Sequence, residues 1–393
     1  MGGTLTSIYN NTSFSLYLNS KAMSKLQEQA STGSKINRAS DNPSAAYQIL
    51  GLNSQKRSLD NYMSTISDAS GILEMSTTII GSMSDEISAI KVSLNQILSG
   101  TYDEDGRERL ANQVNDALEQ MVSLANTKHS GKYIFGGTDT VNSPYEVERT
   151  GSDITSVTYQ GSYEERYIEV APGVTSNAYH VGDELFRTDN RGTPVFVGDT
   201  GAVGGTGTSS IKGNAWLEVT HDGTDYNLSI GGATVDLGTV ADLSNVAVKN
   251  ANGEVLYVDA RNISSTGTEM VSVPGTYDIF NVLISVRDLL LNEQDLTTTQ
   301  LNECRKKLSD SLDEVNSLLL SKETSIGSKI GFIEDLKNTL ENIKFNTEDE
   351  ATLLQEADIA EIAIDLARRE ALYQLTLSVA GRLMSMTLLD FIE

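Results

Sequence analysis

The acidic run Asp103, Glu104, Asp105 and Gly106 is the part of this sequence that most closely matches the start of a metal-binding loop. A calcium loop of the EF-hand type needs oxygen ligands at alternating positions, a glycine at the sixth position and a glutamate at the twelfth. Gly106 comes too early for that spacing, and the segment TYDEDG at 101–106 separates two helical patterns. We therefore interpret it as an interhelical turn and predict no metal site.

Histidine is rare, and the three histidines are His129, His180 and His221. His129 is expected at the C-terminus of a helix, where a cation suits the helix dipole. His180 and His221 each lie near an acid in sequence (Asp183 and Asp222), but such pairs are common on protein surfaces. A Ser–His–Asp site can assemble from distant positions, yet the sequence has no nucleophile elbow. We predict that the chain is not an enzyme and has no catalytic residue.

Two further motifs point away from cofactor chemistry. The segment GGTGTSSIKG lacks the GxxxxGK[ST] spacing of a phosphate-binding loop. The single cysteine, Cys304, rules out an intramolecular disulfide and a metal site with several cysteines. The sequence therefore predicts no cofactor, and Cys304 is expected to pack inside a helical interface.

The charge balance limits the possible partners. The formal net charge is −25, from 29 basic and 54 acidic residues, so no basic face is expected for nucleic acid or an anionic membrane. The apolar C-terminal stretch is interrupted by Arg382, and its uncharged part, residues 371–381, is too short to span a bilayer. No ordinary secretory signal is visible at the N-terminus. We predict neither nucleic-acid binding nor membrane insertion.

Glycine and proline divide the chain into a central segment and two flanks. Residues 131–275 hold most of the 32 glycines and four of the five prolines. They alternate apolar and polar residues between turn signals, for example in AWLEVTHDG and GEVLYVDA, which is typical of strands. HDGTD is predicted to form a hairpin turn. We predict one compact β-rich domain here.

The flanks carry the three–four apolar spacing of long helices. One pattern begins at Pro43, which suits a first helical position, with Asn42 or Asp41 as the cap. A returning helix follows residue 106 and ends at Gly131, and a further long helical pattern lies within 276–346. Such patterns need helical partners. We predict that 43–131 packs against 276–346 as an antiparallel helical rod, with the β domain looped out.

The two chain ends differ from the rest of the flanks, because the C-terminal segment has an unusually wide apolar face. The last 35 residues carry two neighbouring apolar rows, and the second contains Leu372, Leu375, Val379, Leu383 and Met386. The helix before Gly33 offers only a weaker stripe, so a pair of such helices leaves apolar surface uncovered. We predict an assembly interface of thirteen apolar residues: Ile8, Leu18, Leu26, Ile359, Ile362, Leu366, Tyr373, Leu377, Ala380, Leu383, Met384, Leu388 and Phe391.

These patterns give a fold class that is mainly α with a β-rich insert. We expect terminal helices at 1–40 and 356–393 as the assembly core. A helical rod domain is expected at 41–140 and 275–355, and a β-rich outer domain at 141–274.

Three segments carry a family likeness. LQEQASTGSKINRASDNPSAA at 26–46, GKYIFGGTDTVNSPYEV at 131–147 and ADIAEIAIDLARREALYQLTLSVAGRLMSMTLLDFI at 357–392 resemble the flagellin superfamily of bacterial flagella. The better match within it is the family of hook–filament junction proteins, the type 3 hook-associated proteins. Flagellins proper tend to have an alanine-rich DDAAG-like segment where this chain has SDNPSAA. Ala39 and Asn42 depart from the family's usual proline and aspartate. The likeness covers both flanks but not the β insert.

The resemblance implies an extracellular structural protein of the flagellum that is exported unfolded by the type III apparatus. Its implied partners are copies of itself in a helical layer, a hook-side junction protein, the flagellin filament and an export chaperone at the C-terminal region. Copies would stack through head-to-tail contacts that do not close on themselves. The alternatives are flagellin itself, a coiled-coil adhesin or toxin translocator, and an enzymatic β insert.

Two consequences follow for experiments. The β insert is expected to be dispensable, so that a Gly/Ser linker in place of 145–270 leaves motility largely intact. The terminal segments are expected to be disordered in the isolated monomer and to fold on assembly.

Overall fold

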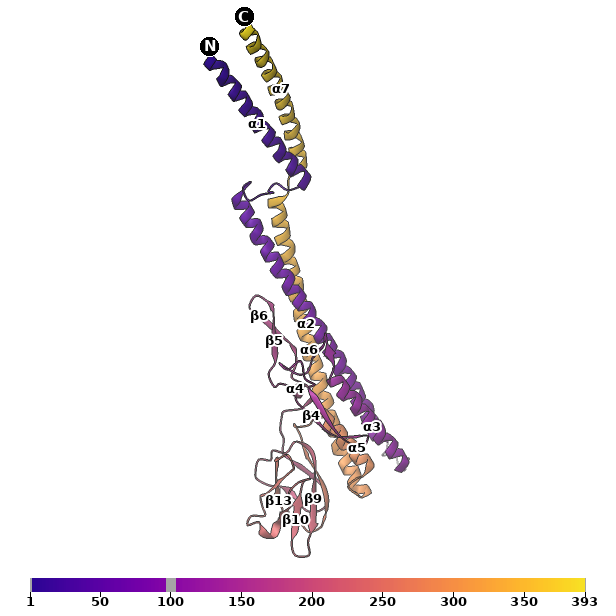
Figure 1. The fold of residues 1–393 in the computed structure, drawn as a ribbon. Coiled ribbons are helices and arrows are strands. Elements are labelled where there is room, and N and C mark those ends of the chain that lie inside the picture. The colour runs from indigo at the N-terminus through magenta and orange to yellow at the C-terminus, as the bar shows by residue number, and fades with distance from the viewer. Residues whose placement is uncertain (1, 97–103, 393) are drawn as a thin grey trace. The chain divides into compact units, whose positions relative to one another are not determined.

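The computed structural model describes residues 2–96 and 104–392 (Figure 1). The chain forms two compact units, Met1–Ser64 with Leu336–Glu393, and Thr65–Asp335. Both boundaries between the units fall inside long helices, α2 (Pro43–Gln96) and α6 (Thr298–Gln355). The predicted fold class, mainly α with a central β-rich region, is confirmed.

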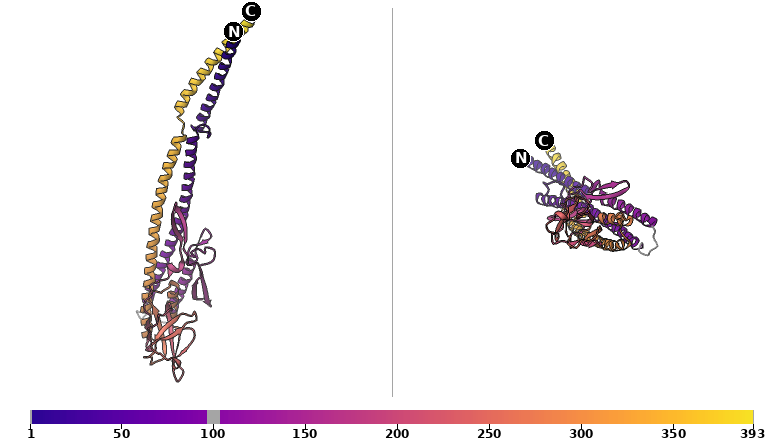
Figure 2. Two further views of the ribbon diagram at one scale, coloured as in Figure 1. Left: turned by 90° about the vertical axis from the view of Figure 1, so that its left-hand side faces the viewer. Right: turned by 90° about the horizontal axis from the view of Figure 1, so that it is seen from below.

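In the first unit, the helices from the two chain ends lie side by side. Helix α1 (Gly2–Thr32) runs along α7 (Ile359–Ile392) in the opposite direction, as both Figure 1 and Figure 2 show. Helix α1 ends at Thr32 and is followed by Gly33, whose φ of 66° suits a residue without a side chain. The predicted end of the first helix before Gly33 is therefore confirmed.

Helix α2 begins where the sequence predicted. Pro43 is its first residue, and the side-chain oxygen of Asn42 accepts a hydrogen bond from the backbone N–H of Ala45 at 3.2 Å. Asn42 is therefore the N-cap, and Asp41 has a different role that is described below. An Asn cap satisfies one of the N–H groups that a helix start leaves without a partner.

Helices α2 and α6 are antiparallel partners. In the first unit, Lys56 pairs with Glu348 and Asp60 with Lys344, each at 2.7 Å. In the second unit, Ser84 donates to Asn316 at 2.6 Å. The predicted apolar positions of both helices are largely buried: Leu59, Ile66, Leu73, Ile80, Met83, Ile87, Ile90 and Leu94 in α2, and Cys304, Leu308, Leu312, Val315, Leu319, Ile326, Ile333 and Leu340 in α6.

The second unit adds two shorter helices, α3 (Glu104–Ala125) and α5 (Ile279–Leu291), which pack against each other. The sequence did not predict the break between α5 and α6. Asn292 ends α5 in the left-handed conformation, with φ 52°. Its side chain then binds the backbone N–H and C=O of Leu296. This polar turn explains the break, since asparagine tolerates the left-handed region better than most residues.

The β region contains fourteen strands among the described residues. Their bounds are β1 Lys128–His129, β2 Lys132–Tyr133, β3 Tyr145–Thr150, β4 Asp153–Tyr159, β5 Arg166–Ala171, β6 Val174–Tyr179, β7 Val195–Val197, β8 Val203–Gly204, β9 Gly213–His221, β10 Tyr226–Ser229, β11 Val235–Asp236, β12 Val246–Lys249, β13 Val255–Asp259 and β14 Gly267–Val273. A short helix, α4 (Gly182–Phe186), follows β6, and a 3₁₀ turn, Leu237–Thr239, follows β11. The predicted HDGTD hairpin is confirmed, because β9 and β10 pair across it.

These strands fall into two groups. Strands β7–β14 form a five-stranded sheet in the order β11-β10-β9-β14-β7 and a three-stranded sheet in the order β12-β13-β8. The two sheets share one apolar core, which includes Leu217, Val271, Val248 and Leu256. We call residues 195–273 the β sandwich.

The earlier strands are tied to helices instead. The hairpin β3–β4 packs on α3 and α5. The buried guanidinium of Arg287 in α5 donates to the backbone C=O of Ile154 and to the side chain of Asn115 in α3. Arg149 also forms a bidentate ion pair with Glu119. The compact β domain expected over 131–275 is thus divided, while the outer-domain boundaries 141–274 stay a prediction.

The sandwich joins the rest of its unit through two adjacent backbone segments, which we call the neck (residues 188–192 and 274–278). The N–H of Asn190 donates to Gly275 C=O at 2.8 Å, and that of Gly192 to Pro274 C=O at 2.7 Å. Thr188 N–H likewise donates to Tyr277 C=O. The chain therefore enters and leaves the sandwich at one place.

Substituting Gly275 by alanine is expected to destabilise the protein by about 3 kcal/mol or more. Gly275 has φ 75°, and an added Cβ would lie 1.7 Å from the backbone oxygen of Asn190. That oxygen belongs to the hydrogen-bonded neck and cannot move away cheaply. Gly173→Ala is the matched control, because Gly173 has φ 74° but open space around it. It should cost only about 1–2 kcal/mol. Equal losses in calorimetric unfolding of the two variants would contradict this account of the neck.

Candidate functional site

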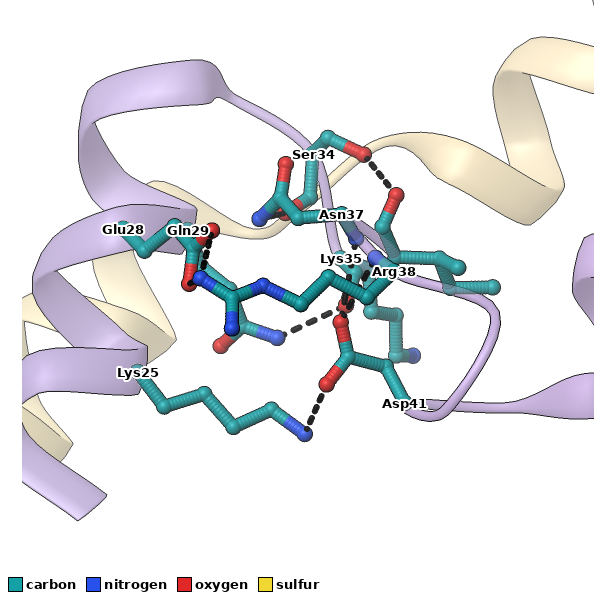
Figure 3. Close-up of polar contacts among 9 residues, drawn as sticks. Lys25, Glu28, Gln29, Ser34, Lys35, Asn37, Arg38 and Asp41 are labelled. Atoms are coloured by element: carbon teal, nitrogen blue, oxygen red, sulfur yellow. Dashed lines mark hydrogen bonds and ion pairs between the residues drawn. The ribbon is translucent and has the colours of Figure 1, made fainter. Parts of the chain in front are cut away.

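The connection between α1 and α2 is a polar turn built from the family-like segment 26–46 (Figure 3). The carboxylate of Asp41 accepts hydrogen bonds from the backbone N–H groups of Asn37 at 3.2 Å and Arg38 at 3.0 Å. It also pairs with the Lys25 ammonium of α1 at 2.9 Å. The Lys25 hydrogen bond and these N–H donors lower the pKa of Asp41. Asp41 therefore joins the turn to α1.

Further polar contacts hold the same turn. Arg38 pairs with Glu28 of α1 at 3.2 Å, and the side chain of Gln29 donates to the C=O of Lys35 at 2.7 Å. The hydroxyl of Ser34 donates to the C=O of Ile36. These contacts fix the path of the chain between the two helices.

The turn is also bonded to the connection between α6 and α7. Lys35 N–H donates to Gln355 C=O at 2.7 Å, and Ala357 N–H donates to Gly33 C=O at 3.0 Å. Ser34 and Glu356 form an antiparallel bridge between these hydrogen bonds. The two connections therefore form one junction, from which α1 and α7 extend as a pair.

One face of α7 belongs to this pair. Ile362 is buried, and Leu366, Tyr373 and Ala380 are half-buried. Their spacings of four and seven residues put them on one side of the helix. Asp358 caps the helix by accepting hydrogen bonds from the N–H groups of Ala360 and Glu361. Four residues of the predicted interface thus take part in packing within the chain.

A second apolar face of α7 is exposed. Ile364, Leu372, Leu375 and Val379 are between 45% and 70% exposed. At 100° per residue these four side chains lie on the side of the helix opposite Leu366, Tyr373 and Ala380. Helix α1 also carries exposed apolar side chains, at Phe14, Tyr17 and Leu18. We call these seven residues the outer apolar surface. An exposed apolar surface of this kind indicates an interaction site.

The remaining predicted interface residues are distributed as follows. Leu26 is half-buried, and Leu18, Ile359 and Leu377 are about half exposed. The side chains of five residues lie outside the part that the structure describes: Ile8, Leu383, Met384, Leu388 and Phe391. Sequence reasoning placed Leu372, Leu375 and Val379 in a second row without assigning them to the interface, and it missed Ile364, Phe14 and Tyr17. The spacing of Ile364 from Leu372 continues that row and could have revealed it.

The three histidines considered for catalysis lie in different places: strand β1, strand β9 and the segment between β6 and α4. His180 is buried, and burial lowers its pKa to about 4. Nearby Asp183 forms an ion pair with Arg187 instead. His221 accepts a hydrogen bond from Gly223 N–H through Nδ1, while Asp222 binds the N–H groups of the hairpin turn. His129 lies in strand β1, beyond the end of α3, rather than in a helix.

Within the described residues, no three His, Cys, Asp or Glu side chains are grouped so that they could hold a metal ion. No helix of the described chain is both long and apolar enough to cross a membrane. Glu104, Asp105 and Gly106 of the acidic run form the first turn of α3, and Asp103 lies outside the described residues.

Comparison with known proteins agrees with the sequence likeness. Residues 5–140 match the family model of the bacterial flagellin N-terminal helical region. Flagellar hook-associated protein 3 of Salmonella typhimurium is 27% identical over 165 residues, which is 42% of this chain. The match spans 50% of that relative's length.

Solved structures share the fold. The flagellar hook-associated protein-3 of Legionella pneumophila aligns with a TM-score of 0.52 at 15% identity, covering 78% of this chain and 97% of that one. The flagellar junction protein of Legionella pneumophila aligns with a TM-score of 0.50 at 16% identity, covering 78% and 100%. At such low identity the likeness concerns the fold.

Proposed function

We propose that this chain, which is a flagellin-like protein, is a structural component of the bacterial flagellum that joins the hook to the filament. The observation that carries the proposal is the outer apolar surface of α1 and α7. These helices already cover each other on one side, so only another molecule can cover the opposite side. The hook-associated names of its relatives favour the junction over other positions in the flagellum.

The mechanism is head-to-tail packing of terminal helices. Each copy would place the apolar row at Ile364, Leu372, Leu375 and Val379 against helices of its neighbours. Such contacts are heterologous and need not close within a pair, so the copies form a layer along a helical lattice. The partners of this layer are a hook-side junction protein below and flagellin above. No catalytic step is involved.

We further propose that the protein is exported by the flagellar type III apparatus and acts outside the cell. A cytoplasmic chaperone would cover the C-terminal region before export. An exposed apolar helix face is an aggregation hazard in the cytoplasm, and this need supports a chaperone for α7.

Self-association distinguishes this role from that of flagellin. The experiment incubates the purified chain under conditions that polymerise flagellin and examines it by electron microscopy. A junction protein should give short rings or remain monomeric. Long filaments of this chain alone would contradict the junction role and favour the hypothesis that the chain is a flagellin.

A further inference from the structure

Two carboxylates and one guanidinium interact electrostatically beside the neck of the β sandwich: those of Asp278, Asp183 and Arg187. Asp278 is 7% exposed and caps α5 by accepting hydrogen bonds from Phe280 N–H at 2.9 Å and Asn281 N–H at 3.2 Å. The backbone of Arg187, just after α4, forms an isolated antiparallel β-bridge with the backbone of Asp278. The Arg187 guanidinium forms its ion pair with Asp183 instead. The side chain of Arg187 is therefore held by Asp183 and its backbone by Asp278, while its charge acts on both carboxylates.

The surroundings of Asp278 are aromatic. The ring of Phe280 lies 4.9 Å from that of Tyr145 and 6.1 Å from that of Phe186, between ring centroids. The hydroxyl of Tyr145 is buried without a hydrogen-bond partner. Such surroundings disfavour a charged carboxylate, because they replace water with groups of low polarity.

The pKa values of the cluster follow from this burial. Desolvation raises the pKa of Asp278 from 3.8 to about 6, although its two N–H donors and Arg187 oppose the shift. Burial also raises the pKa of Asp183 and holds that of Tyr145 well above its ordinary value. The other charged or titratable groups nearby are Tyr159 of β4, Tyr163, Glu184 of α4, Asp189, Arg191, Lys212 and Lys322 of α6.

We propose that this cluster is an acid-tightened clamp, which holds the start of α5 to the segment after α4 more firmly as the pH falls from 8 to 5. Hydrogen bonds of the backbone connect this cluster to the sandwich. Thr188 N–H donates to Tyr277 C=O, and Tyr277 N–H donates to the Thr188 hydroxyl, each at 2.8 Å. Both bonds adjoin the Arg187–Asp278 bridge and lead into the sandwich.

The direction of the pH dependence follows from the linkage between proton binding and closure of the neck. A carboxyl group whose folded pKa lies above its ordinary value binds a proton more tightly when the clamp is closed. Protonated Asp278 therefore stabilises the closed neck fully below pH 3.8, and this stabilisation is lost as the pH rises through about 6. Local opening of the neck should therefore be roughly tenfold less frequent at pH 5 than at pH 8.

Amide hydrogen exchange of the full chain tests the clamp, with rates corrected for the intrinsic pH dependence of exchange. Peptides covering residues 186–192 and 276–284 should gain about tenfold protection between pH 8 and pH 5. In Asp278→Asn the amide oxygen can still accept the two N–H bonds, and the pH dependence should disappear. Asp358→Asn is the matched control, because Asp358 caps α7 with the same two bonds but is exposed.

Three results would overturn the proposal. The first is a change in protection of less than twofold between pH 8 and pH 5 in the unmodified chain. This measurement does not depend on the folding of a variant. The second is a tenfold change that persists in Asp278→Asn. The third is a change that disappears in Asp183→Asn but not in Asp278→Asn, since the titrating group would then be Asp183.

Discussion

Cells that carry Leu375→Asp are expected to build hooks without filaments and to shed flagellin into the medium. Leu375 is 64% exposed in the single chain and lies in the middle of the outer apolar row of α7. In the assembled layer the new carboxylate would be buried without a partner, which costs on the order of 3 kcal/mol or more and weakens each contact about 100-fold. Electron microscopy of cells and immunoblots of culture supernatant measure the outcome.

The adjacent residue provides the control. Gln374 is also exposed on α7 but does not belong to the apolar row. Gln374→Asp adds the same charge and should leave filaments of normal length. Both variants should be secreted in similar amounts, because the substitutions are at exposed positions of a single helix. Normal filaments in the Leu375→Asp strain, with the variant present in its flagella, would refute the assignment of this surface.

Two deletions of the β region should behave very differently. Replacing residues 193–273 by a short Gly/Ser linker removes the sandwich and joins two ends that are already hydrogen-bonded to each other in the neck. This variant should fold, with a loss of about 2 kcal/mol at most from newly exposed groups. Circular dichroism and calorimetry would show an intact helical transition.

The longer replacement, of residues 145–270, should destabilise the helices of the second unit by roughly 5 kcal/mol or more. It removes Tyr145 from the ring of Phe280 and leaves the buried guanidinium of Arg287 without the Ile154 carbonyl. We therefore expect only the sandwich, residues 195–273, to be dispensable, and not the whole segment 145–270. Equal stability of the two deletion variants would show that the hairpin β3–β4 contributes nothing to the helices.

The helical part of the fold could be predicted from the sequence because its signals are local. The apolar spacing from Leu59 to Leu94 is repeated over many turns, and Gly33, Asn42 and Pro43 mark helix ends by their own backbone preferences. These features depend on residues close together in the chain, which sequence patterns describe well.

The division of the β region could not be predicted because it depends on distant contacts. Strand β4 alternates like any half-buried strand, and only the Arg287 and Asn115 contacts show that it packs on helices. The break at Asn292 was also missed, since one left-handed residue interrupts an otherwise helical composition.

The candidate surface was predicted in part. The sequence indicated that the terminal helices carry more apolar surface than one partner can cover. It placed Tyr373 and Ala380 in one row and Leu375 and Val379 in a neighbouring row, but it did not show that the first row packs within the chain and that the second is exposed. That assignment requires the position of α1, which the spacing within α7 does not contain.

Immunogold labelling of isolated flagella tests the central claim most directly. An antibody against the β sandwich, residues 195–273, would be applied to flagella with their hooks attached and imaged by electron microscopy. If the chain joins the hook to the filament, gold particles should gather in one narrow zone at the boundary between them. Labelling along the whole filament, or none on flagella that are otherwise intact, would contradict the account.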